Sequence, residues 1–153
     1  MPTTRRARRS KPWRVVGHTA EVALELSGRT WAAFYRNAAL GFLEVVKASG
    51  KPAAVKRIRL KLAAPSGEEL LVAWLNELVY LVSAKRWLPV ALRVKSRAPT
   101  ELEAEITGGP MDAEAAKRQA RASVAVEVKA ATFGGLRLTR EGGLLRAKII
   151  LDV

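Results

Sequence analysis

The feature that most restricts the fold is a capped helix with apolar residues on nearly every side. Ser66-Gly67-Glu68-Glu69 has the S-x-x-E form, in which a serine hydroxyl and a glutamate three residues later bind free amide groups at a helix N-terminus. The apolar residues that follow are Leu70, Leu71, Trp74, Leu75, Leu78, Val79, Leu81 and Val82. A helix with so little polar surface has to be enclosed by other elements, so we expect it in the middle of the fold.

Another helix and two strands are expected before this central helix. Val22 to Leu26 and Lys56 to Leu62 alternate apolar and polar residues, as half-buried strands do. Thr30 can cap a helix that begins at Trp31, whose apolar residues recur at spacings of three and four. We expect this helix to end near Gly50.

Several short strands are expected after the central helix. Val90 to Val94 and Leu102 to Ile106 alternate and are separated by turn-prone residues, which predicts a hairpin. Met111 to Ala122 has no clear apolar face and is expected to be an exposed loop or a short helix. The remaining predicted strands are Val124 to Ala131, Leu136 to Thr139 and Leu144 to Val153, with a tight turn at Gly142-Gly143.

This order of elements predicts the fold class. Strands grouped around two helices, rather than a regular alternation of strand and helix, favour an α+β domain. We expect two main helices packed on a largely antiparallel sheet. A chain of 153 residues usually forms one domain around one core, and we assign residues 13–153 to it.

The composition excludes several kinds of site. There is no cysteine, which removes disulfides, disulfide-linked partners, thiolate nucleophiles and sulfur-rich metal sites. His18 is the single histidine, whereas zinc and copper centres usually recruit several imidazole or thiolate ligands. A hard cation held by carboxylates is compatible with the sequence. No stretch is apolar enough to span a membrane, so we expect no membrane segment.

The chain is strongly basic, with a formal net charge of +13, which should attract polyanions such as nucleic acids. Part of this charge lies in residues 1–12, which we expect to be a disordered tail. Its Arg5, Arg6, Arg8 and Arg9 are candidates for salt-sensitive attraction to phosphates. The tail lacks the apolar stretch of a secretory signal, so we expect a cytoplasmic protein.

The predicted strand from Lys56 to Leu62 is basic on its polar face. Arg57, Arg59 and Lys61 alternate with apolar residues and should point away from the core. This pattern is typical of a solvated strand face, and it is also what a phosphate-binding stripe would look like. The sequence alone leaves both interpretations open.

Three blocks of sequence, taken together, resemble the archease family. They are HTAEV from His18 to Val22, EELLVAWLNELVYL from Glu68 to Leu81, and the VKAATFGGL and KIILDV segments of the last third. Each block alone is unspecific, but their order and spacing are specific and cover nearly the whole chain from Trp13 onward. The resemblance implies a small cytoplasmic α+β protein that promotes the activity of an RtcB-type RNA ligase, the enzyme that joins tRNA halves after intron removal.

The resemblance also implies a partner and a calcium site. The partner is the RtcB-type ligase in its RNA-bound or nucleotide-bound state, so tRNA is reached through it. Two acidic positions that hold calcium in the family correspond here to Glu21 and Asp152, and the Val153 carboxylate could add oxygen ligands. Lys129 matches a lysine that helps the ligase. His18 either acts at this site or fixes its loop by binding the backbone.

The predicted strands give this site a physical basis. Glu21 and Asp152 both fall on the polar faces of their strands, so neither carboxylate is forced into the core. Two carboxylates close together repel each other, and a hard divalent cation relieves that repulsion while taking the oxygen ligands it prefers. Adjacent strands could bring the two side chains together.

Two positions depart from the family pattern. Glu21 replaces an aspartate, which keeps a carboxylate but lengthens the side chain and can change metal affinity. Phe133-Gly134 replaces a frequent Tyr-His pair, which removes a hydroxyl and an imidazole near Lys129.

Two other functions stay open. A general RNA-binding module would use the basic tail and the basic strand face. An enzyme is the weakest interpretation, because no Ser-His-Asp set and no phosphate-cradling glycine motif can be argued. We therefore expect an accessory protein with no catalytic residue of its own.

Overall fold

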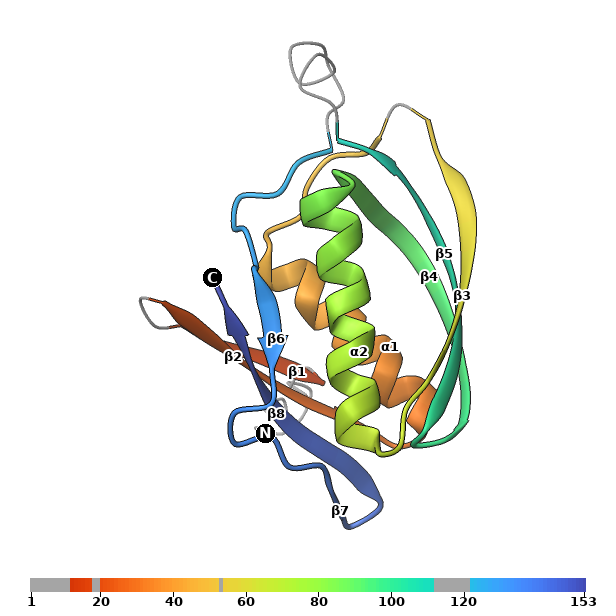
Figure 1. The fold of residues 1–153 in the computed structure, drawn as a ribbon, viewed down its shortest axis with the longest axis vertical. Coiled ribbons are helices and arrows are strands. Elements are labelled where there is room, and N and C mark those ends of the chain that lie inside the picture. The colour runs from red at the N-terminus through yellow and green to blue at the C-terminus, as the bar shows by residue number, and fades with distance from the viewer. Residues whose placement is uncertain (1–11, 18–19, 53, 112–121) are drawn as a thin grey trace, which may run out of the picture.

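The computed structural model describes residues 12–17, 20–52, 54–111 and 122–153. This part of the chain forms two sheets with two α-helices between them (Figure 1). In chain order the elements are β1 (Trp13–Gly17), β2 (Glu21–Gly28), α1 (Trp31–Val45), β3 (Lys56–Ala63), α2 (Gly67–Val79), the π-helical turn η2 (Tyr80–Ala84), β4 (Trp87–Ala98), β5 (Glu101–Pro110), β6 (Ala130–Thr132), β7 (Thr139–Glu141) and β8 (Leu144–Asp152).

The two sheets enclose the helices from opposite sides. The larger sheet has the order β1-β2-β8-β6, with β7 pairing with another part of β8, and the smaller sheet has the order β3-β5-β4. All pairs among the described strands are antiparallel. Helix α1 packs against β2 and β4, and α2 packs against β6 and β3. The α+β class with two helices and antiparallel strands is confirmed, although the strands divide into two sheets.

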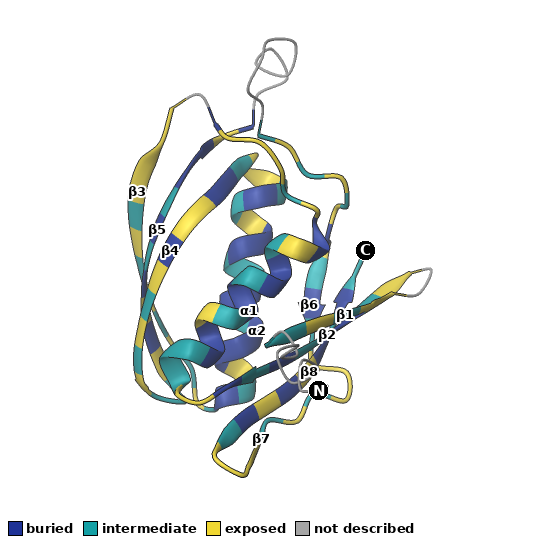
Figure 2. Ribbon diagram, turned by 180° about the vertical axis from the view of Figure 1, so that it is seen from behind, coloured by how far each residue is buried: buried dark blue, intermediate teal, exposed yellow. Residues whose placement is uncertain are grey.

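The core lies in the helical layer, where Figure 2 shows the buried residues concentrated. Trp74 of α2 is fully buried and its indole nitrogen donates to the carbonyl oxygen of Tyr35 on α1 at 2.8 Å. The serine half of the predicted cap is present, since the Ser66 hydroxyl oxygen accepts from the Glu69 amide at 3.1 Å, whereas the Glu69 carboxylate accepts from the Ser66 hydroxyl at 3.0 Å. The prediction that the helix after Ser66 would be enclosed is therefore confirmed.

Helix α1 begins where it was predicted but ends earlier. Thr30 is its N-cap and Trp31 its first residue. Its last residue is Val45, so the predicted end near Gly50 is wrong. The first residue with a left-handed backbone after the helix is Lys47, with φ 55°. The chain thus leaves the helix before it reaches the glycine.

The predicted strand from Val124 to Ala131 is wrong over most of its length, because β6 comprises only Ala130–Thr132. The preceding residues cross the end of α1, where the amides of Ala125 and Val126 donate to the carbonyl of Val46 at 2.9 and 3.1 Å. One side of this segment packs on the core without a neighbouring strand. Alternation here reflects one-sided burial rather than sheet pairing.

The last hairpin differs from the prediction in its first strand only. The predicted strand Leu136 to Thr139 is displaced, since pairing begins at Thr139 and the amide of Leu138 instead donates to the Glu68 carboxylate at 3.0 Å. Gly142 and Gly143, with φ 57° and 80°, form the predicted tight turn. Strand β8 follows as predicted and becomes a central strand of the larger sheet.

The hairpin of β4 and β5 is confirmed, and both strands are longer than predicted. The loop or short helix predicted between Met111 and Ala122 lies almost entirely outside the described residues, as does the basic tail apart from Pro12. Within the part of the chain that the structure describes, no helix is both long and apolar enough to cross a membrane.

The hydroxyl of Tyr35 should make stability depend on alkaline pH. It is buried and donates to the carbonyl of Pro99 at 2.7 Å. Burial, with the Glu68 carboxylate adding to it, raises the pKa of Tyr35 well above its usual value of about 10. The unfolded chain therefore releases this proton at lower pH than the folded chain, so stability present below pH 10 is lost as the pH rises further.

We expect the free energy of unfolding to fall between pH 10 and 11 by about 1 kcal/mol more in the wild type than in Tyr35→Phe. At neutral pH, Tyr35→Phe should be less stable by about 1 to 3 kcal/mol, because the Pro99 carbonyl loses a donor. Urea denaturation of both proteins across this pH range measures the two effects. Parallel pH curves would contradict the assignment.

Candidate metal centre

The two predicted acidic ligands face each other across a strand pair. Strands β2 and β8 are antiparallel, and their register places Glu21 directly opposite Asp152. Side chains at directly opposite positions project from the same face of a sheet, with Cβ atoms about 4.5 to 5.5 Å apart. Glu21 is exposed and Asp152 is half-buried. Their carboxylates can therefore approach the same ion from two strands.

The acidic pair lies on the outer face of the larger sheet, the side away from α1. The inner face is defined by Leu24 and Ile149, which face each other in the same register and are fully buried. The next row on the outer face is mainly apolar and joins four strands: Val16, Ala23, Ile150 and Thr132 are successive cross-strand neighbours. The sequence patterns do not predict this row, because it depends on the register of three strand pairs.

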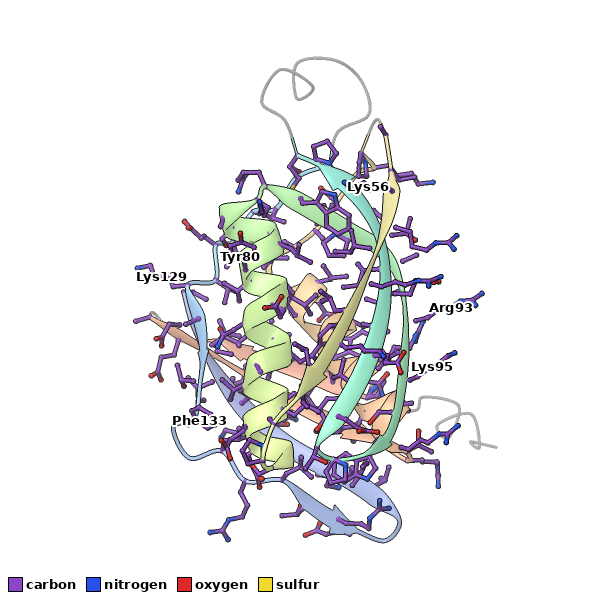
Figure 3. The ribbon with its side chains drawn as sticks, turned by 45° about the vertical axis from the view of Figure 1, so that its right-hand side comes forward. Lys56, Tyr80, Arg93, Lys95, Lys129 and Phe133 are labelled. Carbon is purple, nitrogen blue, oxygen red and sulfur yellow. The ribbon has the colours of Figure 1, made fainter. Side chains whose placement is uncertain are left out.

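Lys129 is joined to the strand that carries Asp152 by a backbone hydrogen bond. Its amide donates to the Asp152 carbonyl oxygen at 2.8 Å, and Ala130 faces Asp152 across the pair of β6 and β8. The Lys129 side chain is exposed, and Figure 3 shows it projecting from the margin of the molecule. Asp152 of β8 is thus flanked by Glu21 of β2 on one side and by the start of β6 on the other.

The other predicted site residues are placed as follows. The Val153 amide donates to the carbonyl of Ala20 at 3.2 Å, which joins the end of β8 to the residue before β2. Phe133 is 54% exposed. His18 and the tail arginines Arg5, Arg6, Arg8 and Arg9 lie outside the described residues.

Asn76 of α2 is a positioning residue that the sequence patterns do not predict. Its side-chain oxygen accepts from the Ala131 amide at 2.9 Å, and its side-chain nitrogen donates to the Ala131 carbonyl at 3.4 Å. It therefore binds the open edge of β6 much as another strand would. In the π-helical turn that follows, the Ser83 hydroxyl donates to the Val128 carbonyl at 3.3 Å. These contacts fix the segment that carries Lys129.

Asn76→Ala should destabilise the protein by about 1 to 3 kcal/mol, because both polar groups of Ala131 lose their partner. Hydrogen exchange should accelerate most at the amides of Lys129 and Ala131. Asn37→Ala is the matched control, since the Asn37 side chain donates one hydrogen bond, 2.9 Å long, to the Ser27 carbonyl. If exchange in β6 is equally fast in both variants, Asn76 does not hold the strand.

The donor set fits a hard cation in part. Two carboxylates supply oxygen ligands of the kind calcium prefers, but calcium takes about six to eight oxygens. Within the described ranges, no group of three or more Asp, Glu, His or Cys residues could hold a metal together. Glu21 and Asp152 would therefore provide two ligands, with backbone oxygens or water supplying the others.

The fold and the acidic pair together define a small α+β protein with a candidate cation site where two strand ends meet. Residues 13–153 match the model of the Archease protein family. The chain belongs to the archease family.

Similar proteins cover nearly the same length. Protein archease of Methanosarcina barkeri is 26% identical, with 94% of this chain and 97% of the relative covered. Protein archease of Methanothermobacter thermautotrophicus is 28% identical, with 88% and 94% covered. The crystal structure of an archease from Thermotoga maritima, described as a possible chaperone, superposes with a TM-score of 0.62 at 22% identity, covering 90% of this chain and 94% of that one. At this identity the superposition supports the fold alone.

Proposed function

We propose that this protein is an accessory factor that activates an RtcB-type tRNA-splicing RNA ligase by promoting its guanylylation and turnover. The observation that carries the proposal is the register of β2 and β8, which sets Glu21 opposite Asp152 in a chain of the archease family. In this role the chain contributes no catalytic residue. It acts in the cytoplasm, and it reaches tRNA through the ligase.

The proposed site combines a bound cation with an exposed lysine. Glu21 and Asp152 hold calcium, which when bound neutralises two carboxylates that would otherwise repel each other. Lys129, whose backbone amide donates to the Asp152 carbonyl, contributes an exposed side chain from the strand segment next to Asp152. In the neighbouring row, the exposed Val16 and the half-buried Ile150 supply apolar surface for the ligase. The Lys129 ammonium then contacts an acidic group of the ligase or a nucleotide phosphate.

The test is a ligation assay with a cognate ligase under conditions that require many turnovers. The wild-type protein should raise the number of turnovers, and Asp152→Ala should reduce this stimulation by about 10- to 100-fold, as loss of groups that support a metal typically does. Glu25→Ala is the matched control, because Glu25 lies on the same face of β2 but is bound to Arg14 at 3.0 Å. Equal ligase turnover with and without this protein would refute the proposed function.

A further inference from the structure

The outer face of the smaller sheet carries an ordered pattern of charge. Its central strand, β5, presents Glu103 and Glu105, and each has a cation directly opposite it on both neighbouring strands. The two rows are Arg59–Glu105–Arg93 and Lys61–Glu103–Lys95. The alternate positions Leu60, Ala104, Ile106 and Leu92 belong to the core side of the sheet or pack against it. All six charged side chains therefore share the face turned away from the helices.

These rows make two parallel lines of positive charge, which we call the cationic rails. One rail is Arg57, Arg59 and Lys61 on β3, and the other is Arg93 and Lys95 on β4. The rails are separated by one strand and so lie about 10 Å apart, with about 7 Å between successive cations along each rail. Four of these cations, Arg59, Lys61, Arg93 and Lys95, line an open groove together with Glu103 and Glu105.

Most of the positive charge on the rails is available to a ligand. The guanidinium of Arg59 lies 3.3 Å from the Glu105 carboxylate and that of Arg57 lies 3.9 Å from it. Both arginine side chains nevertheless stay largely in solvent, at 79% and 63% exposure, whereas Glu105 is 28% exposed. One half-buried carboxylate can use only a few of the donors on two exposed guanidinium groups. The remaining N–H donors of these guanidinium groups can bind phosphate oxygens.

We propose that the cationic rails bind double-stranded RNA across its minor groove. An A-form helix presents a wide, shallow minor groove flanked by two phosphate backbones and lined with 2′-hydroxyl groups. Each rail contacts one backbone. Glu103 and Glu105, along the midline, are acceptors that face the hydroxyl donors of the groove. An acidic protein bound to the two lines of cations would gain no contact from the line of carboxylates between them.

The rails are separate from the proposed calcium site. They lie on the outer face of one sheet, and Glu21 and Asp152 lie on the outer face of the other, with the helices between. Figure 3 shows Arg93 and Lys95 on one side of the molecule and Lys129 and Phe133 on the opposite side. RNA binding by the rails therefore does not depend on ligase activation, and the two can be tested independently.

The experiment measures binding of a labelled RNA duplex by the full chain at several salt concentrations. Arg93→Glu/Lys95→Glu should weaken binding at least about tenfold at low salt and reduce the slope of log K against log salt by about two. Arg137→Glu/Arg140→Glu is the control, because both arginines are exposed outside this sheet and the two variants have the same net charge. Arg93→Gln/Lys95→Gln repeats the test with a milder change, and thermal unfolding checks that each variant is folded.

Comparison of ligands tests the groove contact. A DNA duplex of the same sequence lacks the 2′-hydroxyl and should bind more weakly than RNA, and Glu103→Ala/Glu105→Ala should reduce this preference. Equal losses in the rail variant and its control would overturn the proposal, since the cations would then act only through net charge or as protection of edge strands. Equal affinity for the two duplexes, or tighter binding of polyglutamate than of RNA, would also overturn it.

Discussion

Replacing Asp152 with asparagine is expected to stabilise the metal-free protein and to abolish its stabilisation by calcium. In the absence of metal, Glu21 and Asp152 are like charges at directly opposite positions of a strand pair, which destabilises a sheet by up to about 1 kcal/mol. With calcium at about 100 times its Kd, the wild type should gain about 2.7 kcal/mol in free energy of unfolding. Asp152→Asn should gain almost nothing. Denaturation in EDTA and in calcium measures both effects.

The control for this prediction is Glu25→Gln, which removes a carboxylate from the same face of β2. Glu25 is bound to Arg14 at 3.0 Å and faces Lys148 rather than an acid. Its loss should therefore not raise the free energy of unfolding in EDTA. It should leave the calcium effect intact. A calcium response of equal size in both variants, or none in the wild type, would exclude Glu21 and Asp152 as the metal site, whatever the outcome of the ligation assay.

Trp74→Ala is expected to cause the largest loss of stability among these predictions. Trp74 is fully buried between the two sheets, and truncating a buried tryptophan costs about 3 to 5 kcal/mol through lost burial and the cavity left behind. The variant also loses the bond from the indole nitrogen to the Tyr35 carbonyl, 2.8 Å long, which joins α2 to α1. For a domain of this length the melting temperature should fall by roughly 10 °C.

Trp31→Ala is the matched control for Trp74→Ala. Trp31 begins α1 and is only half-buried, with its ring stacked on that of Tyr35 at a centroid distance of 6.0 Å. An aromatic pair contributes about 0.5 to 1.5 kcal/mol beyond the area it buries, so the loss should be well below that of Trp74→Ala. Calorimetry of the two variants makes the comparison. Equal losses would mean that α2 is not the centre of the core.

The helices could be predicted from the sequence because their signals are local. Thr30 and Ser66 cap the helices that follow them, and spacings of three and four mark the faces they bury. The strand from Val124 to Ala131 was predicted wrongly because alternation reports one-sided burial, and here the buried side meets the end of α1. Division of the strands into two sheets depends on long-range pairing, which no local pattern encodes.

The candidate site was only partly accessible from the sequence. Alternation placed Glu21 and Asp152 on polar strand faces, and the family resemblance suggested that they act together. Their direct opposition depends on the register of β2 and β8, which only the folded chain provides. The role of Asn76 could not be inferred from its being a polar residue in a largely apolar helix. Asn76 binds the backbone amide and carbonyl of Ala131, and such backbone contacts leave no signature in the sequence.

The central place of β8 has a consequence for how this protein is made. Strand β2 is synthesised early, yet the neighbour that covers one of its edges is β8, which leaves the ribosome late. Until β8 pairs with β2, that edge of β2 exposes unpaired amide and carbonyl groups with which a strand of another molecule can pair. The two carboxylates also remain far apart in a nascent chain. Chains interrupted before Leu144 should therefore be prone to aggregate.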